Sequence, residues 1–398
     1  MKKNLKKKVI IILISLMMLH FYLKCSPITS IQIFISTHNL DQKKYWVGED
    51  SKIVIKKYPE NSIEKIYFTS ENNKIELLKN HFLLKTSGRE CLTAYTKLNK
   101  INTTICFNIY NTPELKFKEN NPLKIEIKEV KQLHLDYKDY PKSNIKYKSS
   151  NPEIIKINNE GLISALRPGS SNITAYGLDF KSVQIQVLAI SNNGLINNTI
   201  LNINNAKLYQ NLMIVAHPDD ETLWGGANLF NESYFVVCLT NGYNLARAND
   251  YRKILEFTNN SGIILNYPDL KENNLRDDWS EVKNGILKDL LIILTFKNWK
   301  KIVTHGPDGT TGHIHHKKTC EYVTKIAKLC NKYSKLYYFG KFFRKNEIPK
   351  YLPRISDKDL SNKMKEISIY KSVERIIYKL WIHMVPYENW VKASIQKI

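Results

Sequence analysis

The spacing of apolar residues changes near residue 210, and this change divides the chain into two kinds of structure. Before residue 191, short alternating runs of apolar and polar residues are separated by Pro, Gly and Asn, which is typical of β-sandwiches. After residue 210, apolar runs alternate with stretches of helical periodicity, which favours a parallel, doubly wound sheet. The sequence therefore predicts a multidomain protein: all-β sandwiches followed by an α/β domain with a mostly parallel sheet.

Composition limits the partners of such a chain. Its 398 residues allow two to four domains, and a hydrophobic content of 43% is ordinary for a globular protein. The formal net charge of +23 favours an anionic partner, although a lysine-rich solvated surface explains the charge equally well. A nucleic-acid binder is disfavoured, because the sequence has no helix-turn-helix, zinc-finger or RNP-like motif.

Residues 1–27 have the pattern of a targeting segment. Five lysines within the first eight residues precede a fifteen-residue apolar run, Val9 to Leu23. This length suits a signal peptide or a short signal anchor. Cleavage, retention as an anchor and lipidation at Cys25 all stay open, and each of them would export the rest of the chain. We expect a protein that is secreted or membrane-anchored, facing outward.

The remaining cysteines do not form a metal or redox motif. Cys91 and Cys106 lie in two β-patterned runs that would be able to pair in an oxidising compartment, which the sequence leaves undecided. Cys238 lies in an apolar run and is interpreted as a core residue, and no CxxC pair is present.

The β-rich part contains an internal repeat. Gly88 and the run 92–95 match Gly169 and the run 173–176 at an offset of 81 residues. The stretch with SSNPEIIKI, NNEGLISALRPGSSNITAYG and SVQIQV resembles a group 2 bacterial Ig-like domain, placed at 112–190. Residues 28–111 are interpreted as a degenerate copy. A spacer role and a glycan- or partner-binding role both remain possible for these units.

Residues 191–209 are Asn-rich and almost uncharged, and we interpret them as a linker to a domain at 210–398. Four strands are expected there, at 212–216, 234–240, 261–267 and 300–306. Helices are expected at Arg247–Asn259, Ser280–Lys297 and His316–Lys332.

Polar, metal-binding residue types follow two of these strands. His217, Asp219 and Asp220 come directly after the first strand, and the loop after the fourth contains His313, His315 and His316. Ligands bind outside the carboxyl ends of parallel strands, so these residues are expected to meet. Imidazole and carboxylate groups without thiolate suit one zinc ion with an open position for water.

The strings AHPDDETLWGG (216–226), LTNG (239–242) and GHIHH (312–316) resemble the PIG-L/LmbE-type metal-dependent de-N-acetylases, over about 210–398. The resemblance implies a Rossmann-like fold and removal of acetyl groups from N-acetylglucosaminyl conjugates. PYENW (386–390) and the helical stretch before it resemble the closing part of that family.

The resemblance assigns roles residue by residue. It implies metal ligation by His217, Asp220 and His316, general-base work by Asp219, and oxyanion stabilisation or protonation of the amine by His313. It also makes Arg247 and Asn241 candidate substrate-binding residues. Where this chain has Ile314 and His315 the family commonly has Pro-Asp, which leaves the loop geometry and the role of His315 open.

The sequence thus predicts an exported zinc-dependent N-deacetylase acting on an N-acetylglucosamine-containing glycan or glycoconjugate. Its expected partners are an N-acetylated sugar, the membrane through the N-terminal segment and an anionic cell-envelope polymer, but not nucleic acid. The alternative is a surface glycan-binding or adhesion protein whose Ig-like modules carry the function. The exact substrate and the oligomeric state are not encoded in any recognisable pattern.

Overall fold

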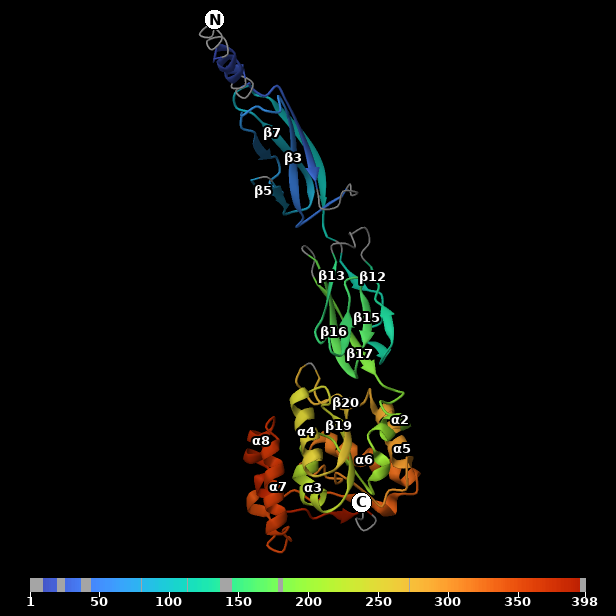
Figure 1. Ribbon diagram of the computed structural model, residues 1–398. Helices are drawn as coiled ribbons and strands as arrows, with labels where there is room; N and C mark the ends of the chain where they lie inside the picture. Colours follow the sequence, from blue (N-terminus) through green and yellow to red (C-terminus); the bar gives the residue numbers. More distant parts are fainter. Residues whose placement is uncertain are drawn as a thin grey trace. The chain divides into compact units, whose positions relative to one another are not determined.

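A computed structural model describes residues 10–19, 26–36, 44–79, 81–112, 114–136, 145–177, 182–271 and 273–393 (Figure 1). Residues 10–19 are helical with exposed side chains. Among the helices of the described residues, none combines the length and apolarity needed to cross a membrane. The rest of the predicted targeting segment up to residue 25, including Cys25, lies outside the described residues.

The first sandwich consists of two four-stranded sheets around one apolar core. Their strand orders are β1-β3-β6-β5 and β2-β8-β7-β4. The strands are β1 (Ser30–Ser36), β2 (Tyr45–Trp46), β3 (Asp50–Tyr58), β4 (Tyr67–Ser70), β5 (Ile75–Leu78), β6 (His81–Leu84), β7 (Gly88–Tyr95) and β8 (Asn102–Tyr110). Alternate side chains of both sheets, such as Ile31, Phe82, Leu92 and Ile109, fill the core.

Cys91 and Cys106, whose pairing the sequence left undecided, are joined by a disulfide bond. They lie directly opposite each other on the antiparallel strands β7 and β8. Because this position brings the two Cβ atoms close together, the bond links neighbouring strands of one sheet.

The second sandwich has a four-stranded sheet, β10-β17-β16-β13, a three-stranded sheet, β11-β15-β14, and the pair β12-β9. Its strands are β9 (Lys116–Phe117), β10 (Leu123–Glu126), β11 (Val130–Gln132), β12 (Leu135–Asp136), β13 (Lys146–Ser149), β14 (Ile155–Ile157), β15 (Leu162–Ala165), β16 (Gly169–Tyr176) and β17 (Val183–Ile190). The repeated glycines begin equivalent strands, β7 and β16, and both have positive φ, 121° at Gly88 and 144° at Gly169. A side chain at either position would be strained, which explains why glycine occurs in both copies.

The third part is built on a six-stranded sheet of order β20-β19-β18-β21-β22-β23. All neighbours are parallel except the edge pair β22–β23. The strands are β18 (Asn211–Val215), β19 (Tyr234–Thr240), β20 (Ser261–Tyr267), β21 (Lys301–Thr304), β22 (Leu336–Tyr338) and β23 (Val391–Lys392). The four predicted strands are confirmed as β18 to β21, and the mostly parallel sheet is as expected.

Helices cover both faces of this sheet (Figure 1). They are α2 (Asn198–Ile203), α3 (Asp220–Asn231), α4 (Leu245–Phe257), α5 (Lys283–Thr295), α6 (Ile314–Leu329), α7 (Asp357–Ile369) and α8 (Glu374–Leu380), with short 3-10 turns η2 (Ala206–Leu208), η3 (Tyr333–Lys335), η4 (Lys345–Glu347) and η5 (Ile382–Met384). Alternate residues of β18 enter two separate cores: Leu212 and Ile214 pack with α2, α5 and α6, while Met213 and Val215 pack with α3, α4, α7 and α8. The three predicted helices are confirmed as α4, α5 and α6.

The prediction of a linker at 191–209 is wrong. Residues 198–203 form helix α2, and Leu201 and Ala206 are fully buried in the core beneath the sheet. The buried carboxylate of Asp289 accepts hydrogen bonds from the backbone N–H groups of Leu195 and Ile196 at 2.8 and 2.9 Å. These residues therefore belong to the α/β fold.

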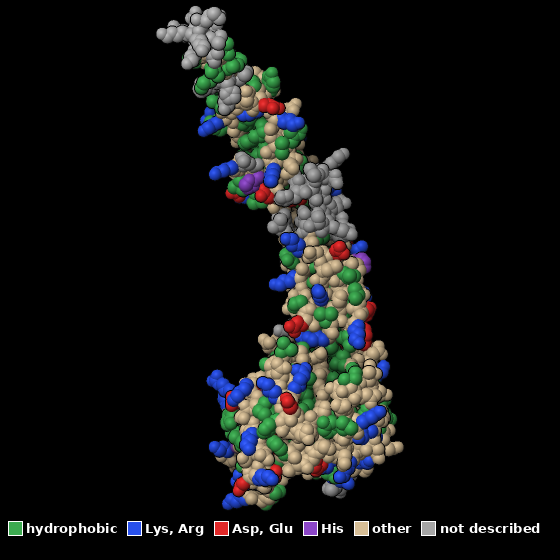
Figure 2. Space-filling view, viewed as in Figure 1, with side chains coloured by type: hydrophobic (Ala, Val, Ile, Leu, Met, Phe, Trp, Pro, Cys, Tyr) green, Lys and Arg blue, Asp and Glu red, His purple; other side chains and the backbone are tan. Residues whose placement is uncertain are grey.

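Charged side chains are spread over this part of the molecule. On the face that Figure 2 displays, Lys and Arg side chains are distributed over the helices with Asp and Glu among them. The basic excess of the sequence therefore extends over this surface.

Candidate metal centre

The candidate site lies where the strand order of the sheet reverses. Strands β18 and β21 are neighbours. The strands that follow them in the sequence, β19 and β22, lie on opposite sides of this pair. Such a switch point leaves a crevice outside the carboxyl ends of the strands, where ligands of open α/β sheets bind. His217 follows β18, and His305 follows β21 directly.

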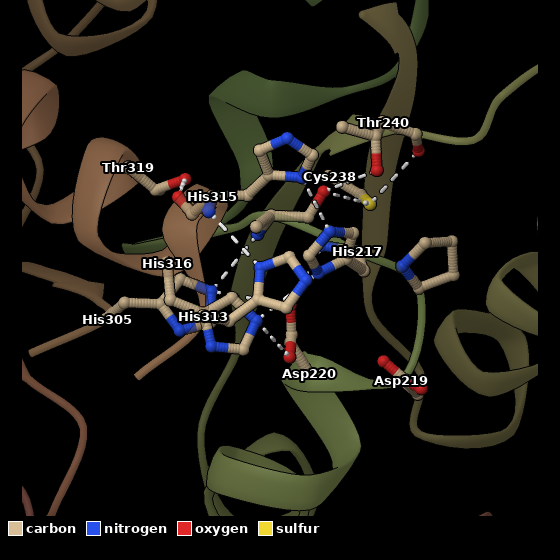
Figure 3. A network of polar contacts seen from close by, with 12 residues as sticks. His217, Asp219, Asp220, Cys238, Thr240, His305, His313, His315, His316 and Thr319 are labelled. Atoms are coloured by element: carbon tan, nitrogen blue, oxygen red, sulfur yellow. Dashed lines mark hydrogen bonds and ion pairs between the residues drawn. The ribbon is translucent and has the colours of Figure 1, made fainter. Parts of the chain in front are cut away.

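Two helix starts deliver further side chains to the same place (Figure 3). Asp220 is the first residue of α3, and His315 and His316 lie in the first turn of α6, for which His313 is the N-cap. Each of these residues apart from His313 is less than 9% exposed, so the cluster is removed from bulk water.

The ligand atoms of the three residues predicted to bind the metal face one another. His217 Nδ1 lies 3.2 Å from His316 Nε2 and 3.4 Å from Asp220 Oδ2, and His316 Nε2 lies 3.2 Å from Asp220 Oδ1. Ligands placed tetrahedrally at zinc distances of roughly 2.0–2.2 Å would lie about 3.3–3.6 Å apart. The spacing of the atoms from these three residues therefore fits one small divalent ion.

Hydrogen bonds to neighbouring groups indicate which ring nitrogen of each histidine carries the proton. His316 Nδ1 donates to the carbonyl oxygen of Gly309 at 3.0 Å, so its Nε2 carries a lone pair. His315 Nε2 donates to the carbonyl oxygen of Asp277 at 2.6 Å, so its Nδ1 accepts from His217 Nε2 at 3.0 Å. Burial opposes protonation of His217, but Asp220 and Asp269 outweigh it and raise its pKa to about 9. In the neutral form that a metal ligand takes, His217 carries its lone pair on the remaining nitrogen, Nδ1. Two imidazole lone pairs and a carboxylate directed at one point repel one another unless a cation lies between them.

Other groupings of ligand-type side chains share residues with this set. His217, Asp269 and His315 form one, Asp220, His305 and His316 another, and His217, His313 and His316 a third. A neutral imidazole has a single lone pair. Since the proton assignment places that of His217 on Nδ1, the grouping with Asp269 and His315 serves to orient His217 rather than to hold a second ion.

Asp269, two residues after the end of β20, contacts several polar side chains. Its Oδ1 lies 3.5 Å from His217 Nε2, and its Oδ2 accepts a hydrogen bond from the Asn241 amide at 3.3 Å. Arg276 forms an ion pair with it, and Arg247 Nη1 lies 3.9 Å away. A carboxylate hydrogen-bonded to the outer nitrogen of a ligating histidine fixes the orientation of that ring.

Aromatic stacking fixes two other rings. His315 is fully buried and lies parallel to Trp279, with centroids 4.3 Å apart. His305 stacks on His316 at 3.9 Å, and its Nε2 accepts from the backbone N–H of Ala216 at 3.1 Å. The rings around the candidate ion are therefore held on more than one side.

A cavity of about 230 Å³ opens beside the three ligands. Its polar lining includes Asp219, Arg247, Arg276 and His313. Its apolar lining consists of Leu223, Trp224, Val373, Ile376, Leu380 and Trp381. A substrate of a few ring atoms would fit there with its reacting group near the ligands.

Asp219 and His313 are placed differently from the three ligands. Asp219 has a φ of 114°, rare for a residue with a side chain, and its Oδ2 lies 3.4 Å from Arg247 Nη2. Arg247 also donates to the carbonyl oxygen of Pro218 at 2.6 Å. His313 Nδ1 accepts from the backbone N–H of His315 at 3.2 Å, while its Nε2 is buried without a partner among the described residues.

Burial and charge shift the titration of these groups. Burial raises the pKa of Asp219 to about 8, although Arg247 opposes this. Burial also opposes ionisation of Asp220, but His316, His305 and His217 outweigh it and hold the pKa of Asp220 well below its usual value. Burial and neighbouring histidines lower the pKa of His313 to about 2 and of His305 to about 4. Asp220 is thus a carboxylate, and both of these rings are neutral.

The structure brings together six of the seven predicted site residues at the cavity. These are His217, Asp219, Asp220, Arg247, His313 and His316. Asn241 is not among the described residues that line it; its amide bonds Thr240 Oγ1 and Asp269 instead. Sequence reasoning missed Asp269 and His305, although each lies within two residues of a strand's carboxyl end, where the fold rule could have found them.

Fold and site together define an α/β protein with a buried histidine and carboxylate cluster at the switch point of a parallel sheet. The chain belongs to the same family as the uncharacterized protein L374 of Acanthamoeba polyphaga mimivirus. The two are 31% identical over 185 residues, covering 42% of this chain and 73% of the viral protein. No protein-family model matches the sequence.

Among solved structures, similarity was found to an S-layer protein and to an intimin fragment. Domains 4 and 5 of the S-layer protein SbsC are 12% identical, covering 41% of this chain and 99% of that chain, with a TM-score of 0.21. A C-terminal intimin fragment, in complex with the intimin-binding domain of its translocated receptor, is 11% identical, covering 47% and 75%, with a TM-score of 0.24. Such scores are too low to support an argument about fold or function.

Proposed function

We propose that this protein is an exported, zinc-dependent N-deacetylase of the PIG-L/LmbE type. It would hydrolyse the acetamide of an N-acetylglucosamine-containing glycan or glycoconjugate. In this proposal residues 210–398 form a Rossmann-like catalytic domain. Ig-like sandwiches at 28–111 and 112–190 hold it away from the membrane and near an anionic envelope polymer. The observation that supports it best is the convergence of His217, Asp220 and His316 within 3.2–3.4 Å of one another beside a cavity.

His217, Asp220 and His316 would hold the zinc ion. When bound, the ion would polarise the acetamide carbonyl and acidify a water molecule. Asp219 lines the cavity but is not one of the three facing ligands. In its ionised form, which burial opposes and Arg247 favours, its carboxylate would accept a proton from the attacking water. Arg247, 3.4 Å from Asp219, holds this carboxylate in place.

His313 is suited to stabilise negative charge on the carbonyl oxygen. Because its Nδ1 accepts a backbone hydrogen bond, the neutral ring carries its proton on Nε2, which is buried without a partner among the described residues. This N–H would donate to the carbonyl oxygen as negative charge develops there. The amine is released with the proton that Asp219 accepted from the water, and acetate is the second product.

The test is acetate release by the purified full-length chain from small N-acetylglucosaminides, glycolipids and wall glycan, together with metal analysis. We expect about one equivalent of divalent metal, lost in both His217→Ala and His316→Ala. Full metal retention in both variants would refute the assignment of the site. Binding of glycan without acetate release from any substrate would favour the adhesion function of the sandwiches instead.

A second variant separates base from ligand. Asp219→Asn should keep the metal and lose activity by on the order of 10²–10⁴-fold, the usual contribution of a general base. Asp220→Asn is its matched comparison and should lose metal. Metal loss in Asp219→Asn with retention in Asp220→Asn would mean that the two carboxylates have exchanged roles.

A further inference from the structure

We infer that one end of the first sandwich is a membrane-contact surface. The surface consists of exposed side chains on two loops, at 59–66 and 97–101: Ile63, Lys65, Lys97, Leu98 and Lys100. We call it the entry surface, because both loops lie beside the point where the chain enters the domain.

Hydrogen bonds join both loops to the entering chain. The N–H of Ile28 donates to Glu64 at 2.7 Å, and the hydroxyl of Ser62 donates to the carbonyl oxygen of Ser26 at 2.6 Å. From the other loop, the Asn99 amide donates to the carbonyl oxygen of Ile28 at 3.3 Å. The two loops and residues 26–28 therefore form one end of the sandwich.

This end presents aliphatic side chains to solvent. Leu98 is 78% exposed and Ile63 is 65% exposed, and both border a hollow of about 380 Å³. Because both largely exposed side chains border the same hollow, they form one apolar patch, and such patches mark interaction sites. The small number of these side chains and their position at the tips suit shallow insertion into a lipid surface.

Lysines surround these side chains. Lys65, Lys97 and Lys100 are exposed, and Lys97 Nζ lies 4.5 Å from the centre of the Tyr67 ring. Glu60 is exposed on the same loops, whereas Glu64 is engaged by Ile28. The excess of positive charge matches anionic lipid headgroups, which attract each nearby lysine by about 1 kcal/mol.

The sequence places an apolar segment close to this end. The run from Val9 to Leu23 ends four residues before Pro27, which lines the hollow. Four residues span at most about 14 Å. If the run is inserted in a bilayer, the entry surface must lie at the headgroups. A soluble acidic polymer would use the lysines but gives no reason for the exposed Ile63 and Leu98.

Lysine acylation measures the contact in the full-length chain. The protein is reconstituted into phosphatidylcholine vesicles and into vesicles that also contain phosphatidylglycerol, treated with a water-soluble amine reagent and analysed by mass spectrometry. We expect Lys65, Lys97 and Lys100 to react about fivefold more slowly on the anionic vesicles, the factor that corresponds to about 1 kcal/mol. The control is the exposed Lys52 at the far end of β3, whose rate should not change.

Variants test the aliphatic contact. Ile63→Ser/Leu98→Ser should restore fast acylation of Lys97, whereas Val54→Ser, an exposed position on β3, should not. Circular dichroism identifies variants that are folded. Equal rates on both vesicle types, equal slowing of Lys52, or the same protection by soluble polyglutamate would overturn the inference, as would protection that survives in the double variant.

Discussion

At the scale of single residues, the partners of His217 decide what the site can hold. One of its nitrogens faces His315 and Asp269, and the other faces His316 and Asp220. Because His315 Nε2 donates to a backbone carbonyl, His315 Nδ1 accepts from His217 Nε2, and neutral His217 keeps its lone pair on Nδ1. These hydrogen bonds thus indicate which of the overlapping groups of histidines and carboxylates would bind the ion.

This reasoning predicts that Asp269 positions His217. Asp269→Asn should weaken metal binding by about 10–100-fold, the usual effect of removing an orienting carboxylate, while the fold is retained. Competition with a chromophoric chelator measures the affinity without reference to activity. The control is Asp278→Asn, a half-exposed carboxylate of the same loop that pairs with Lys271. An unchanged affinity in Asp269→Asn would exclude the positioning role.

The predicted metal ligands and proton-transfer residues share one property: they are grouped along the chain. His217, Asp219 and Asp220 form one group and His313 and His316 another, so a local pattern draws attention to them. Asp269 and His305 stand alone after their strands. Arg276 reaches the cavity from a loop without a recognisable pattern, and its contact with Asp269 depends on tertiary structure.

At the scale of elements, apolar periodicity located every strand from β18 to β21, because each is a buried run of a parallel sheet. The same reasoning failed for residues 191–209, where asparagines suggested a loop. Asn197 is in fact the N-cap of α2, and its side chain accepts the N–H of Ile200 at 3.0 Å. Asparagine is as favourable in a helix cap as in a turn, so composition could not separate the two.

Helix α2 provides a matched pair of substitutions. Leu201 is fully buried, whereas Ile203 on the same helix is 73% exposed. Leu201→Ala should lower the free energy of unfolding of the α/β part by about 2–5 kcal/mol, the cost of a core cavity. Ile203→Ala should change it little. Calorimetry of the two variants checks this, and equal effects would mean that residues 191–209 behave as a linker after all.

In the first sandwich, the buried carboxylate of Glu90 ties β7 to the turn between β4 and β5. It accepts hydrogen bonds from the N–H groups of Asn72 and Lys74 at 3.0 and 2.7 Å. Burial raises the pKa of Glu90, but these and other hydrogen bonds outweigh it and lower the pKa below its ordinary 4.5. The folded state therefore binds protons less readily than the unfolded state, and the contribution of Glu90 to stability is complete above about pH 4.5 and is lost as the pH falls further.

Glu90→Gln should remove this contribution at every pH. The free energy of unfolding should fall by about 1–3 kcal/mol at pH 7, because a buried backbone N–H group would then face the NH2 group of the new side chain. Calorimetry between pH 3 and 7 should show the unfolding temperature of the wild-type sandwich falling towards that of the variant in acid. A constant difference between the two over this range would show that the charge of Glu90 does not stabilise the domain.

At the scale of the whole molecule, the polar residues of the candidate site lie between His217 and His316, and its apolar lining extends to Trp381. Among the described residues, the sandwiches contribute none of them. A chain of residues 191–398 should therefore fold and deacetylate a small soluble N-acetylglucosaminide at close to the full-length rate. It must begin near 191 and not near 205, because Ile196 and Leu201 belong to the core.

On intact envelope material the shortened chain should be slower, since tethering raises the effective concentration of enzyme at a surface. The comparison is the ratio of rates on soluble and envelope substrates for the two chains, with metal content measured in each. A chain starting at 205 is the internal control and should be unstable. If residues 191–398 are folded and metal-loaded but inactive on every small substrate that the full chain cleaves, the sandwiches take part in the chemistry and do not merely position the enzyme.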